Sequence, residues 1–535
     1  MVVPELRPWR AARPHVARAA GAVRPRLARA ARSAGPRVAR LARATAPQLT
    51  RITRPKTWQY TAGAATAGLA LAAGVVTAAG PWDSTGQRTA EQDRAVALEH
   101  TGGADHGRGS RDTGTAAGPP RPAPSAGSVL ASLGGDAGSR PDGAKAAPGG
   151  TALADALDPL LADPALGTRP GATVVDLTTG KRLYGTGAGT PLTPASTTKI
   201  ATGVAALTAL GPDHRLTTRT ALEPDTGELV LVGGGDPTLT ARADARGLAS
   251  LRTLAGQTAA ALKKRDVRKV TLSYDTTLYA GAETHPIGVN ENLARVTALM
   301  ADEARTDDST SGPAPRVPDP AADAARTFAG LLKKHGVTAS APGPSKATNR
   351  ADTLATVSSP PLSALVERML TNSDNDLAEA LARHTAVATG KRADFKGVSA
   401  AVTARLKQLG LPVRGAEFHD GSGLDRADRI TAELLTALLA EAADPDRPEL
   451  RPVLTGLPVA GFTGTLTSRY TDGAAGLVRA KTGTLTGVNT LAGTVVTDQG
   501  RVLAFAFLGS GTTDAWAAQA ALDRAATTLA SCGCA

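Results

Sequence analysis

The sequence predicts an α+β fold for the region from about residue 151 to the C-terminus. Apolar residues with helical spacing alternate there with short apolar runs bounded by turn residues, which is the pattern of mixed helices and strands. With 535 residues, of which only 6 Phe, 4 Trp and 5 Tyr are aromatic, the chain needs more than one compact core or long tails, and cores rich in Leu, Val and Ala. Helices are expected near 197–210, 246–264, 321–335, 361–389, 396–409 and 430–443, and strands near 228–233, 268–273, 490–497 and 501–509.

Residues 1–59 are expected to form a basic cytoplasmic tail. They hold 13 Arg and 1 Lys against the single acid Glu5, whereas the rest of the chain is close to neutral. Proline recurs every 11 residues, at Pro14, Pro25, Pro36 and Pro47. Eleven residues are roughly three helical turns, so short cationic helices on a membrane surface and an unstructured polybasic tail both fit the repeat. The near-neutral body with few aromatic residues predicts no nucleic-acid partner.

An uncharged stretch at 61–80 lies between Trp58 and Trp82. Its length suits a bilayer, tryptophans suit both interfaces, and the positive tail favours a cytoplasmic N-terminus. We therefore expect residues 60–82 to be a single-pass transmembrane signal anchor in the plasma membrane, with the body on the outer side. Anionic inner-leaflet lipids would attract the arginines of the tail. Alternatively, 76–78 is a signal-peptidase site and the body is secreted.

Residues 83–150 are rich in Gly, Pro, Ser, Ala and Thr, and we expect a disordered linker. Order is expected to begin near Thr151. Two apolar runs, 172–177 and 182–184, predict a hairpin around Thr179-Gly180.

The sequence offers no pattern for a metal or cofactor. Cys532 and Cys534 are its two cysteines, so neither a disulfide framework nor a four-cysteine zinc site is expected; the short Cys-Gly-Cys end would form a strained disulfide or stay reduced. The eight histidines show no metal-binding spacing, and a Gly-x-Ser-x-Gly elbow is also missing.

Three short motifs in order carry the candidate chemistry: Ser196-Thr197-Thr198-Lys199, Ser373-Asp374-Asn375 and Lys481-Thr482-Gly483. Each alone is a weak signal, but the ordered trio is a strong one.

Ser196 follows Pro194-Ala195 at the expected start of a helix, so its three-residue spacing from Lys199 puts both side chains on one face. A serine hydroxyl needs a base, and a lysine can serve only if its ammonium form is disfavoured. The helix dipole and a second cation, Lys481, would both lower the pKa of Lys199. Taken alone, the motif would better suit a helix-capping serine followed by a solvated lysine.

Ser373 and Asn375 follow an apolar run and are expected on a turn between helices. The hydroxyl would relay a proton to a leaving amine, and the amide would bond both Lys199 and a substrate carbonyl. The bland alternative is an Asx turn that caps a helix starting near Asp376.

Lys481-Thr482-Gly483-Thr484 precedes an apolar run at 488–496, which predicts an edge strand and then a hairpin turn at 498–500. Gly483 would let a substrate backbone approach, and the Thr484 amide would join that of Ser196 in binding an oxyanion. Lys481 would be a fixed cation that attracts a carboxylate, helped by the Thr482 and Thr484 hydroxyls. A lysine at the start of a strand is otherwise ordinary surface.

This trio resembles the motifs of the active-site serine penicillin-recognising enzymes, and most closely those of the class C low-molecular-mass penicillin-binding proteins, the D-alanyl-D-alanine carboxypeptidase/endopeptidase family. The resemblance covers about residues 151–530 and includes 174–184, 191–196, 234–237, 420–424, 460–466 and 481–493.

The resemblance implies a β-lactamase/transpeptidase-like domain, with an antiparallel sheet between helices and a helical subdomain. This domain would comprise 151–211 and 352–535, with an inserted domain at 212–351. The family's Asp-x-Ser-x-Phe reads Asp275-Thr276-Thr277-Leu278-Tyr279 here, and a Pro-rich run occupies 312–320, so the architecture of the insert stays open.

The implied function is that of a serine-type D-Ala-D-Ala carboxypeptidase/endopeptidase that acts on peptidoglycan stem peptides through an acyl-enzyme, needs no cofactor and is inhibited by β-lactam antibiotics. A catalytically weak penicillin-binding scaffold is one alternative. A β-lactamase is the other, and it is disfavoured because no Glu-x-x-x-Asn follows Asn375.

Overall fold

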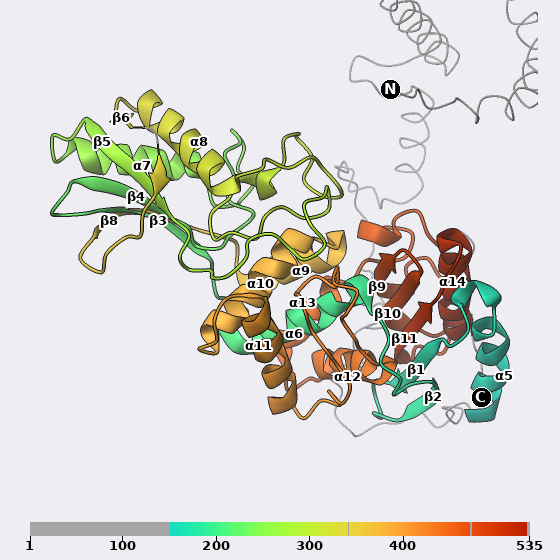
Figure 1. Cartoon of the computed structure of the whole chain (residues 1–535). Helices are drawn as coiled ribbons and strands as arrows, with labels where there is room; N and C mark the ends of the chain where they lie inside the picture. Colours follow the sequence, from blue (N-terminus) through green and yellow to red (C-terminus); the bar gives the residue numbers. More distant parts are fainter. Residues whose placement is uncertain (1–149, 341, 471–472, 532–535) are drawn as a thin grey trace, which may run out of the picture. The chain divides into compact units, whose positions relative to one another are not determined.

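The computed structural model describes residues 150–340, 342–470 and 473–531. The expected tail, signal anchor and linker lie outside these residues, as do Cys532 and Cys534, so those expectations stay predictions. Within the described ranges, no helix has the length and apolar character needed to cross a membrane. The described residues belong to one compact unit, which contains two β-sheets (Figure 1).

The first sheet has the strand order β2-β1-β11-β10-β9, and all its neighbouring strands are antiparallel. Side chains alternate between its faces along the central strand β11: Phe505 and Phe507 enter one core, and Ala504 and Ala506 enter another. Both faces are therefore buried. The strands are β1 (Gly171–Asp176), β2 (Arg182–Thr186), β9 (Val478–Leu485), β10 (Val488–Val496) and β11 (Val502–Ser510).

Helices cover both faces of this sheet. The face of Phe505 packs against α5 (Gly150–Leu161) and α14 (Ala515–Ser531), and the opposite face against α12 (Ala432–Ala443). Beyond α12 lies a helical subdomain whose core is mainly Leu, Val and Ala, as the composition predicts. Its helices are α6 (Thr198–Leu210), α9 (Leu362–Asn372), α10 (Asn375–Ala388), α11 (Phe395–Gln408) and α13 (Arg451–Thr455).

The second sheet lies between α6 and α9 in the chain and has the order β6-β5-β4-β3-β8, with β7 beside β5. Helix α7 (Leu251–Lys263) connects β4 to β5, which makes that pair parallel, and shares a core with α8 (Pro320–Lys334). The strands are β3 (Thr217–Leu222), β4 (Glu228–Val232), β5 (Lys269–Asp275), β6 (Thr338–Ala339), β7 (Gly343–Pro344) and β8 (Asp352–Ser358).

We call residues 217–358, from β3 to β8, the inserted region. Its last strand, β8, pairs with β3 although it lies beyond residue 351, where we expected the insert to end. Between β5 and α8, residues 276–319 contain one short 3₁₀ helix, η5 (Asp302–Ala304). We call this stretch the bridging segment, because it runs from the second sheet to the helical subdomain beside α9 and α10 (Figure 1).

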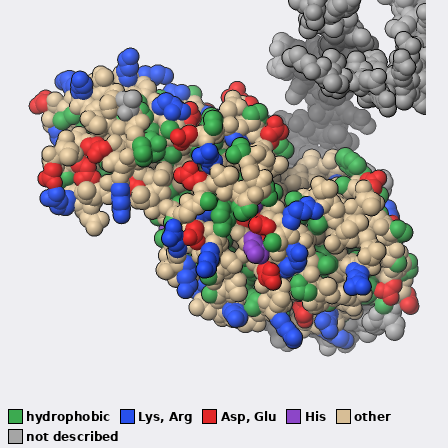
Figure 2. Space-filling model, in the orientation of Figure 1, with side chains coloured by type: hydrophobic (Ala, Val, Ile, Leu, Met, Phe, Trp, Pro, Cys, Tyr) green, Lys and Arg blue, Asp and Glu red, His purple; other side chains and the backbone are tan. Residues whose placement is uncertain are grey.

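The α+β prediction is confirmed, and most of the predicted helices and strands are present near the expected residues. The helical stretch expected at 361–389 is two helices, joined by the predicted turn at Ser373. Strands β3 and β8 and helix α14 were not predicted. Figure 2 shows acidic and basic side chains intermingled over the visible face of the described residues.

Candidate active site

The first motif lies where a 3₁₀ turn, η4 (Ala195–Thr197), leads into α6. A hydrogen bond within the turn stabilises it: the Thr197 hydroxyl donates to the Pro194 carbonyl over 2.7 Å. One turn further along, Lys199 is fully buried, and its Nζ lies 3.0 Å from Ser196 Oγ. The predicted contact between Ser196 and Lys199 is therefore present.

Two further oxygens surround the Lys199 amine. The amine donates to Asn375 Oδ1 over 2.7 Å and to the Ser422 carbonyl over 2.7 Å. Both partners are pure acceptors, so in the neutral amine they take its two N–H groups. The lone pair is then left for the remaining neighbour, the hydroxyl of Ser196. This arrangement suits a general base.

Burial lowers the pKa of Lys199 to about 8, although the carboxylates of Asp420 and Glu379 raise it. The predicted direction is thus confirmed, but burial is its cause rather than the helix dipole and Lys481 that we expected. Lys481 is also fully buried, and burial together with Lys199 holds the pKa of Lys481 well below its usual value.

The second motif forms the junction between α9 and α10. Ser373 adopts the left-handed backbone conformation, with φ of 56°, and ends α9. The side chain of Asp374 then caps α10 by accepting from the Leu377 amide over 2.9 Å. Asn375, the first residue of α10, faces Lys199 with its oxygen and donates through Nδ2 to the backbone carbonyl of Asn292 over 2.9 Å. Capping and active-site geometry therefore coexist in this motif.

The third motif lies on β9, which is an edge strand of the first sheet, as predicted. A Cβ at Gly483 would lie 2.1 Å from Thr490 Oγ1 and 2.7 Å from the Pro194 carbonyl oxygen. Glycine thus lets β9 approach the turn that carries Ser196. The Thr490 hydroxyl donates to the same Pro194 carbonyl over 2.8 Å and fixes this contact.

The three motifs meet in a cleft of about 440 Å³. Lys199 and Lys481 are buried and are not among its lining residues. Lys481 instead donates to the Thr482 carbonyl over 2.7 Å, so the hydroxyl-bearing threonines rather than the lysine line the cleft at β9. From the motifs, the lining residues are Ser196, Ser373, Asp374, Asn375, Thr482 and Thr484; the bridging segment contributes Asn292, Arg305, Ser311, Gly312, Pro313 and Arg316, and the loop before β9 contributes Thr465 and Arg469.

Sequence reasoning assigned no role to the loop at 420–425, which supplies the Ser422 carbonyl to Lys199. A Cβ at Gly423, whose φ is +80°, would lie 1.9 Å from the Ala195 carbonyl oxygen, so glycine lets the loop pack against the Ser196 turn. The Asp420 carboxylate holds the loop together by accepting from the amides of Ser422, Gly423 and Asp425. The two glycines of this loop, Gly421 and Gly423, were the sequence signal for a close backbone approach, but they did not indicate which carbonyl would face Lys199.

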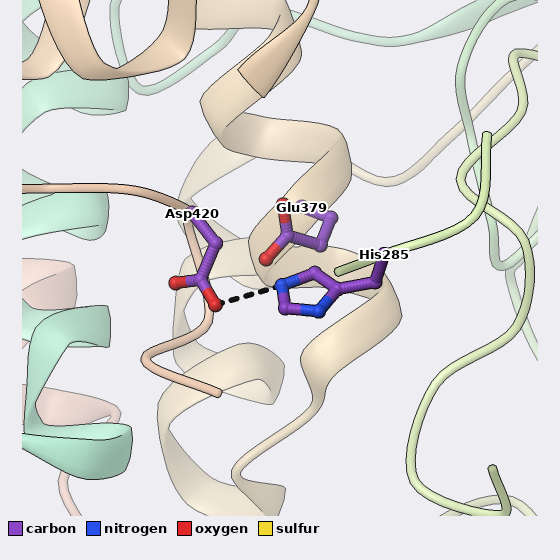
Figure 3. A group of neighbouring side chains, drawn as sticks. All are labelled: His285, Glu379 and Asp420. Atoms are coloured by element: carbon purple, nitrogen blue, oxygen red, sulfur yellow. Dashed lines mark hydrogen bonds and ion pairs between the residues drawn. The ribbon is translucent and has the colours of Figure 1, made fainter. Parts of the chain in front are cut away.

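Among the residues that the structure describes, two buried clusters have ligand atoms close enough to one another for a metal ion: His285, Glu379 and Asp420, and Glu303, Asp374 and Asp376 (Figure 3 shows the first). In the first cluster, Asp420 already accepts from three backbone amides, the Ser422 hydroxyl and His285, which uses its available lone pairs.

Arginine side chains face the second cluster. Arg305 Nε lies 2.7 Å from Glu303 Oε2, and a guanidinium nitrogen of Arg316 lies 2.9 Å from Asp376 Oδ2. Arg368 pairs with Glu303 as well. These contacts engage the carboxylates of Asp420, Glu303 and Asp376 in structural hydrogen bonds and ion pairs.

Comparisons with known proteins identify the family of the chain. The D-Ala-D-Ala carboxypeptidase 3 (S13) family matches residues 153–310 and 306–530 of the chain. Carboxypeptidase DacB of Mycolicibacterium smegmatis is 37% identical over 400 residues, which cover 71% of this chain and 84% of that protein. Penicillin-binding protein 4 from Haemophilus influenzae has a similar fold, with a TM-score of 0.58 and 22% identity over 70% of this chain and 98% of that chain. A second structure of it, complexed with a novel β-lactam, gives a TM-score of 0.54 at 24% identity, with the same coverage.

Proposed function

Because the chain belongs to the D-Ala-D-Ala carboxypeptidase 3 (S13) family, and is accordingly a D-Ala-D-Ala carboxypeptidase, we propose that it hydrolyses peptidoglycan stem peptides through an acyl-enzyme on Ser196. The observation that carries this proposal is the set of contacts at Lys199. Two carbonyl-type oxygens occupy its N–H groups, and Ser196 Oγ lies 3.0 Å from the amine.

In the acylation step, the neutral Lys199 amine takes the proton of Ser196, and the serine oxygen attacks the carbonyl carbon of the penultimate D-Ala. The backbone amides of Ser196 and Thr484 would stabilise the oxyanion. When the tetrahedral intermediate collapses, the C–N bond breaks and the terminal D-Ala leaves with the proton, which Ser373 passes on from Lys199. Water, deprotonated by the same lysine, then hydrolyses the ester.

The terminal carboxylate of the substrate would lie against the cleft wall formed by Thr482 and Thr484. Lys481 would attract this carboxylate electrostatically, although its buried side chain does not line the cleft. Burial disfavours the ammonium form of Lys481, but an incoming carboxylate favours it, so we expect substrate binding to raise the pKa of Lys481.

We further propose that β-lactams acylate Ser196. The H. influenzae protein of similar fold was solved in complex with a β-lactam. A β-lactam, like a peptide, has a carbonyl carbon that a serine oxygen can attack. Since stem peptides lie outside the plasma membrane, we also propose that residues 60–82 hold the body on that side.

The test uses the full-length protein. Incubation with penicillin should add the mass of one drug molecule, and a tripeptide ending in D-Ala-D-Ala should release free D-Ala. Ser196→Ala should abolish both, whereas Ser399→Ala, on helix α11, should change neither. An undiminished mass gain in Ser196→Ala would refute the proposal. Cross-linked dimeric muropeptides, assayed in parallel, show whether endopeptidase activity accompanies the carboxypeptidase activity.

A further inference from the structure

We propose that His285, in the bridging segment of the inserted region, is a positioning residue for the reaction, because it holds the loop whose Ser422 carbonyl orients the Lys199 amine. This inference rests on the proposed role of Lys199 as the base. It assigns part of the catalytic geometry to a residue outside the three motifs.

The first step is the contact between His285 and Asp420 (Figure 3). His285 Nε2 lies 2.9 Å from Asp420 Oδ2, with side-chain exposures of 1% and 0%. The other ring nitrogen, Nδ1, accepts from the Ile287 amide over 3.2 Å, which leaves Nε2 as the nitrogen that donates to Asp420. The ring of Phe395 meets the imidazole edge to face at 5.3 Å and restricts its orientation.

The second step runs from Asp420 to Lys199. Asp420 Oδ1 accepts from the amides of Ser422 and Gly423 over 3.0 and 2.6 Å, which fixes the backbone on both sides of the Ser422 carbonyl. That carbonyl lies 2.7 Å from Lys199 Nζ. A change in the orientation of Asp420 therefore moves one of the two oxygens that direct the lone pair of Lys199.

Glu379 on α10 supports the same loop from the other side. Its Oε1 accepts from the amides of Gly421 and Ser422 over 3.0 and 2.9 Å. Its Oε2 is buried without a hydrogen-bond partner among the described residues, and the carboxylate lies beside the imidazole of His285 (Figure 3). Burial and the charge of Asp420 raise the pKa of Glu379 to about 7.

The bridging segment also holds the second oxygen that faces Lys199. The Asn292 carbonyl accepts from Asn375 Nδ2 over 2.9 Å, and the Ala294 amide donates to Asp376 Oδ1 over 2.9 Å, at the first turn of α10. One stretch of chain, from His285 to Ala294, thus fixes both acceptors of the Lys199 N–H groups: Ser422 through a side chain and Asn375 through the backbone.

The charges around His285 give a signature that a purely structural contact would lack. The carboxylates of Glu379, Asp420 and Asp425 act electrostatically on the imidazole, and Arg383 acts on Glu379. Asp420, Glu379, Asp374 and Asp428 act on Lys199, which in turn acts on Lys481. Burial raises the pKa of Asp420, but the hydrogen bond from His285 outweighs it, together with backbone amides, and keeps the carboxyl ionised. The Asp420 charge in turn raises the pKa of Lys199. Without the hydrogen bond from His285, burial would favour the protonated form of Asp420. The negative charge that raises the pKa of Lys199 would then be lost, so this pKa should fall.

The experiment compares His285→Phe, which fills the space without donating, with His285→Gln, whose amide N–H reaches toward Asp420, in the full-length protein. In His285→Phe we expect the rate of penicillin acylation and kcat for D-Ala release to fall about tenfold or more, which is the scale of one hydrogen bond to a charged group, with KM little changed. The acidic limb of the pH profile of kcat/KM should move to lower pH. His285→Gln should recover most of the rate and the wild-type limb.

Exposed His335, at the end of α8, provides the matched control: His335→Gln should behave as the wild type. Thermal unfolding identifies variants that fail to fold. If His285→Phe does not fold, His285→Gln decides the outcome, because a folded Gln variant with a tenfold loss refutes a role based on donation. A folded His285→Phe with wild-type rate and pH profile also refutes the inference. Activity that survives Ser196→Ala would instead refute the proposed function, so the two failures are distinct.

Discussion

Turn η4, helices α6 and α10 and strand β9 carry the proposed reacting groups, whereas the bridging segment of the inserted region carries groups that hold them in place. Lys199 and Asn375 lie in the first turns of α6 and α10, and Ser196 lies in the turn that leads into α6. His285 and Asn292 lie in a stretch with little regular structure and act through one hydrogen bond each. The difference indicates that short local motifs supply the reacting groups, while contacts between segments distant in the sequence fix the orientation of these groups.

The largest loss of activity is expected when the base itself is removed. Lys199→Met keeps the length of the buried side chain but offers no amine, so acylation by penicillin should slow about 10²- to 10⁴-fold, as for loss of a general base. The rate of mass gain measures this. Lys396→Met, on α11, serves as control because its side chain is exposed. A Lys199→Met variant that acylates at the wild-type rate would require another base.

This prediction concerns the part of the site that the sequence predicts well. The spacing of Ser196 and Lys199 on one helix face, the turn at Ser373 and the edge strand with Gly483 follow from patterns within a few residues. The contact of His285 with Asp420 joins residues 135 positions apart, and Asn292 contributes only its backbone carbonyl. Neither leaves a local pattern, so sequence reasoning missed both.

The missed elements have similar physical reasons. Strands β3 and β8 read TTRTAL and DTLATVS. Strand β3 buries the polar residues Thr218 and Thr220, and β8 has exposed polar residues on both sides of its short apolar ones, so neither strand contains an apolar run. Helix α14 buries alanines along most of its inner face, and alanine contributes little to an apolar pattern. Pairing with other strands holds both in the sheet: β3 pairs with β4 and β8, and β8 pairs with β3.

A second prediction concerns the ion pair between the two regions. Arg316 lies in the bridging segment, Asp376 on α10, and their side chains are 3% and 2% exposed. Arg316→Ala leaves a buried carboxylate without its cation, which should lower the free energy of unfolding by about 3–5 kcal/mol in urea titrations at pH 7. Asp376→Asn added to it should recover part of the loss.

The pH dependence of this loss gives its control. Burial raises the pKa of Asp376 to about 6, and Arg316 lowers it. Below that pH the carboxyl is already protonated in the folded wild type, so removing the cation should cost less at pH 5 than at pH 7. An equal loss at both pH values would show that Arg316 stabilises the junction by packing alone.

A third prediction uses the pKa of Lys199, which burial lowers to about 8. Only the amine form accepts the Ser196 proton, so kcat/KM should rise about tenfold per pH unit below that value and level off above it. Glu379 raises the pKa of Lys199, so Glu379→Gln should move the rise to lower pH, while the amide oxygen of the new side chain still accepts from Gly421 and Ser422. An unchanged profile in Glu379→Gln would mean that another group limits the reaction.

The smallest effect is expected for an ion pair in the inserted region whose two side chains are exposed to solvent. Arg350 pairs with Asp225, and their side chains are 72% and 62% exposed. Water and salt screen such a pair, so Arg350→Ala should change the free energy of unfolding by less than about 1 kcal/mol and leave D-Ala release unchanged. Together with Arg316→Ala, this variant distinguishes two explanations for how much an ion pair of the inserted region contributes to stability. If both variants lower the free energy of unfolding equally, the location of the ion pair in the inserted region determines the effect. If only Arg316→Ala lowers it substantially, the burial of the pair against α10, which carries Asn375, determines the effect.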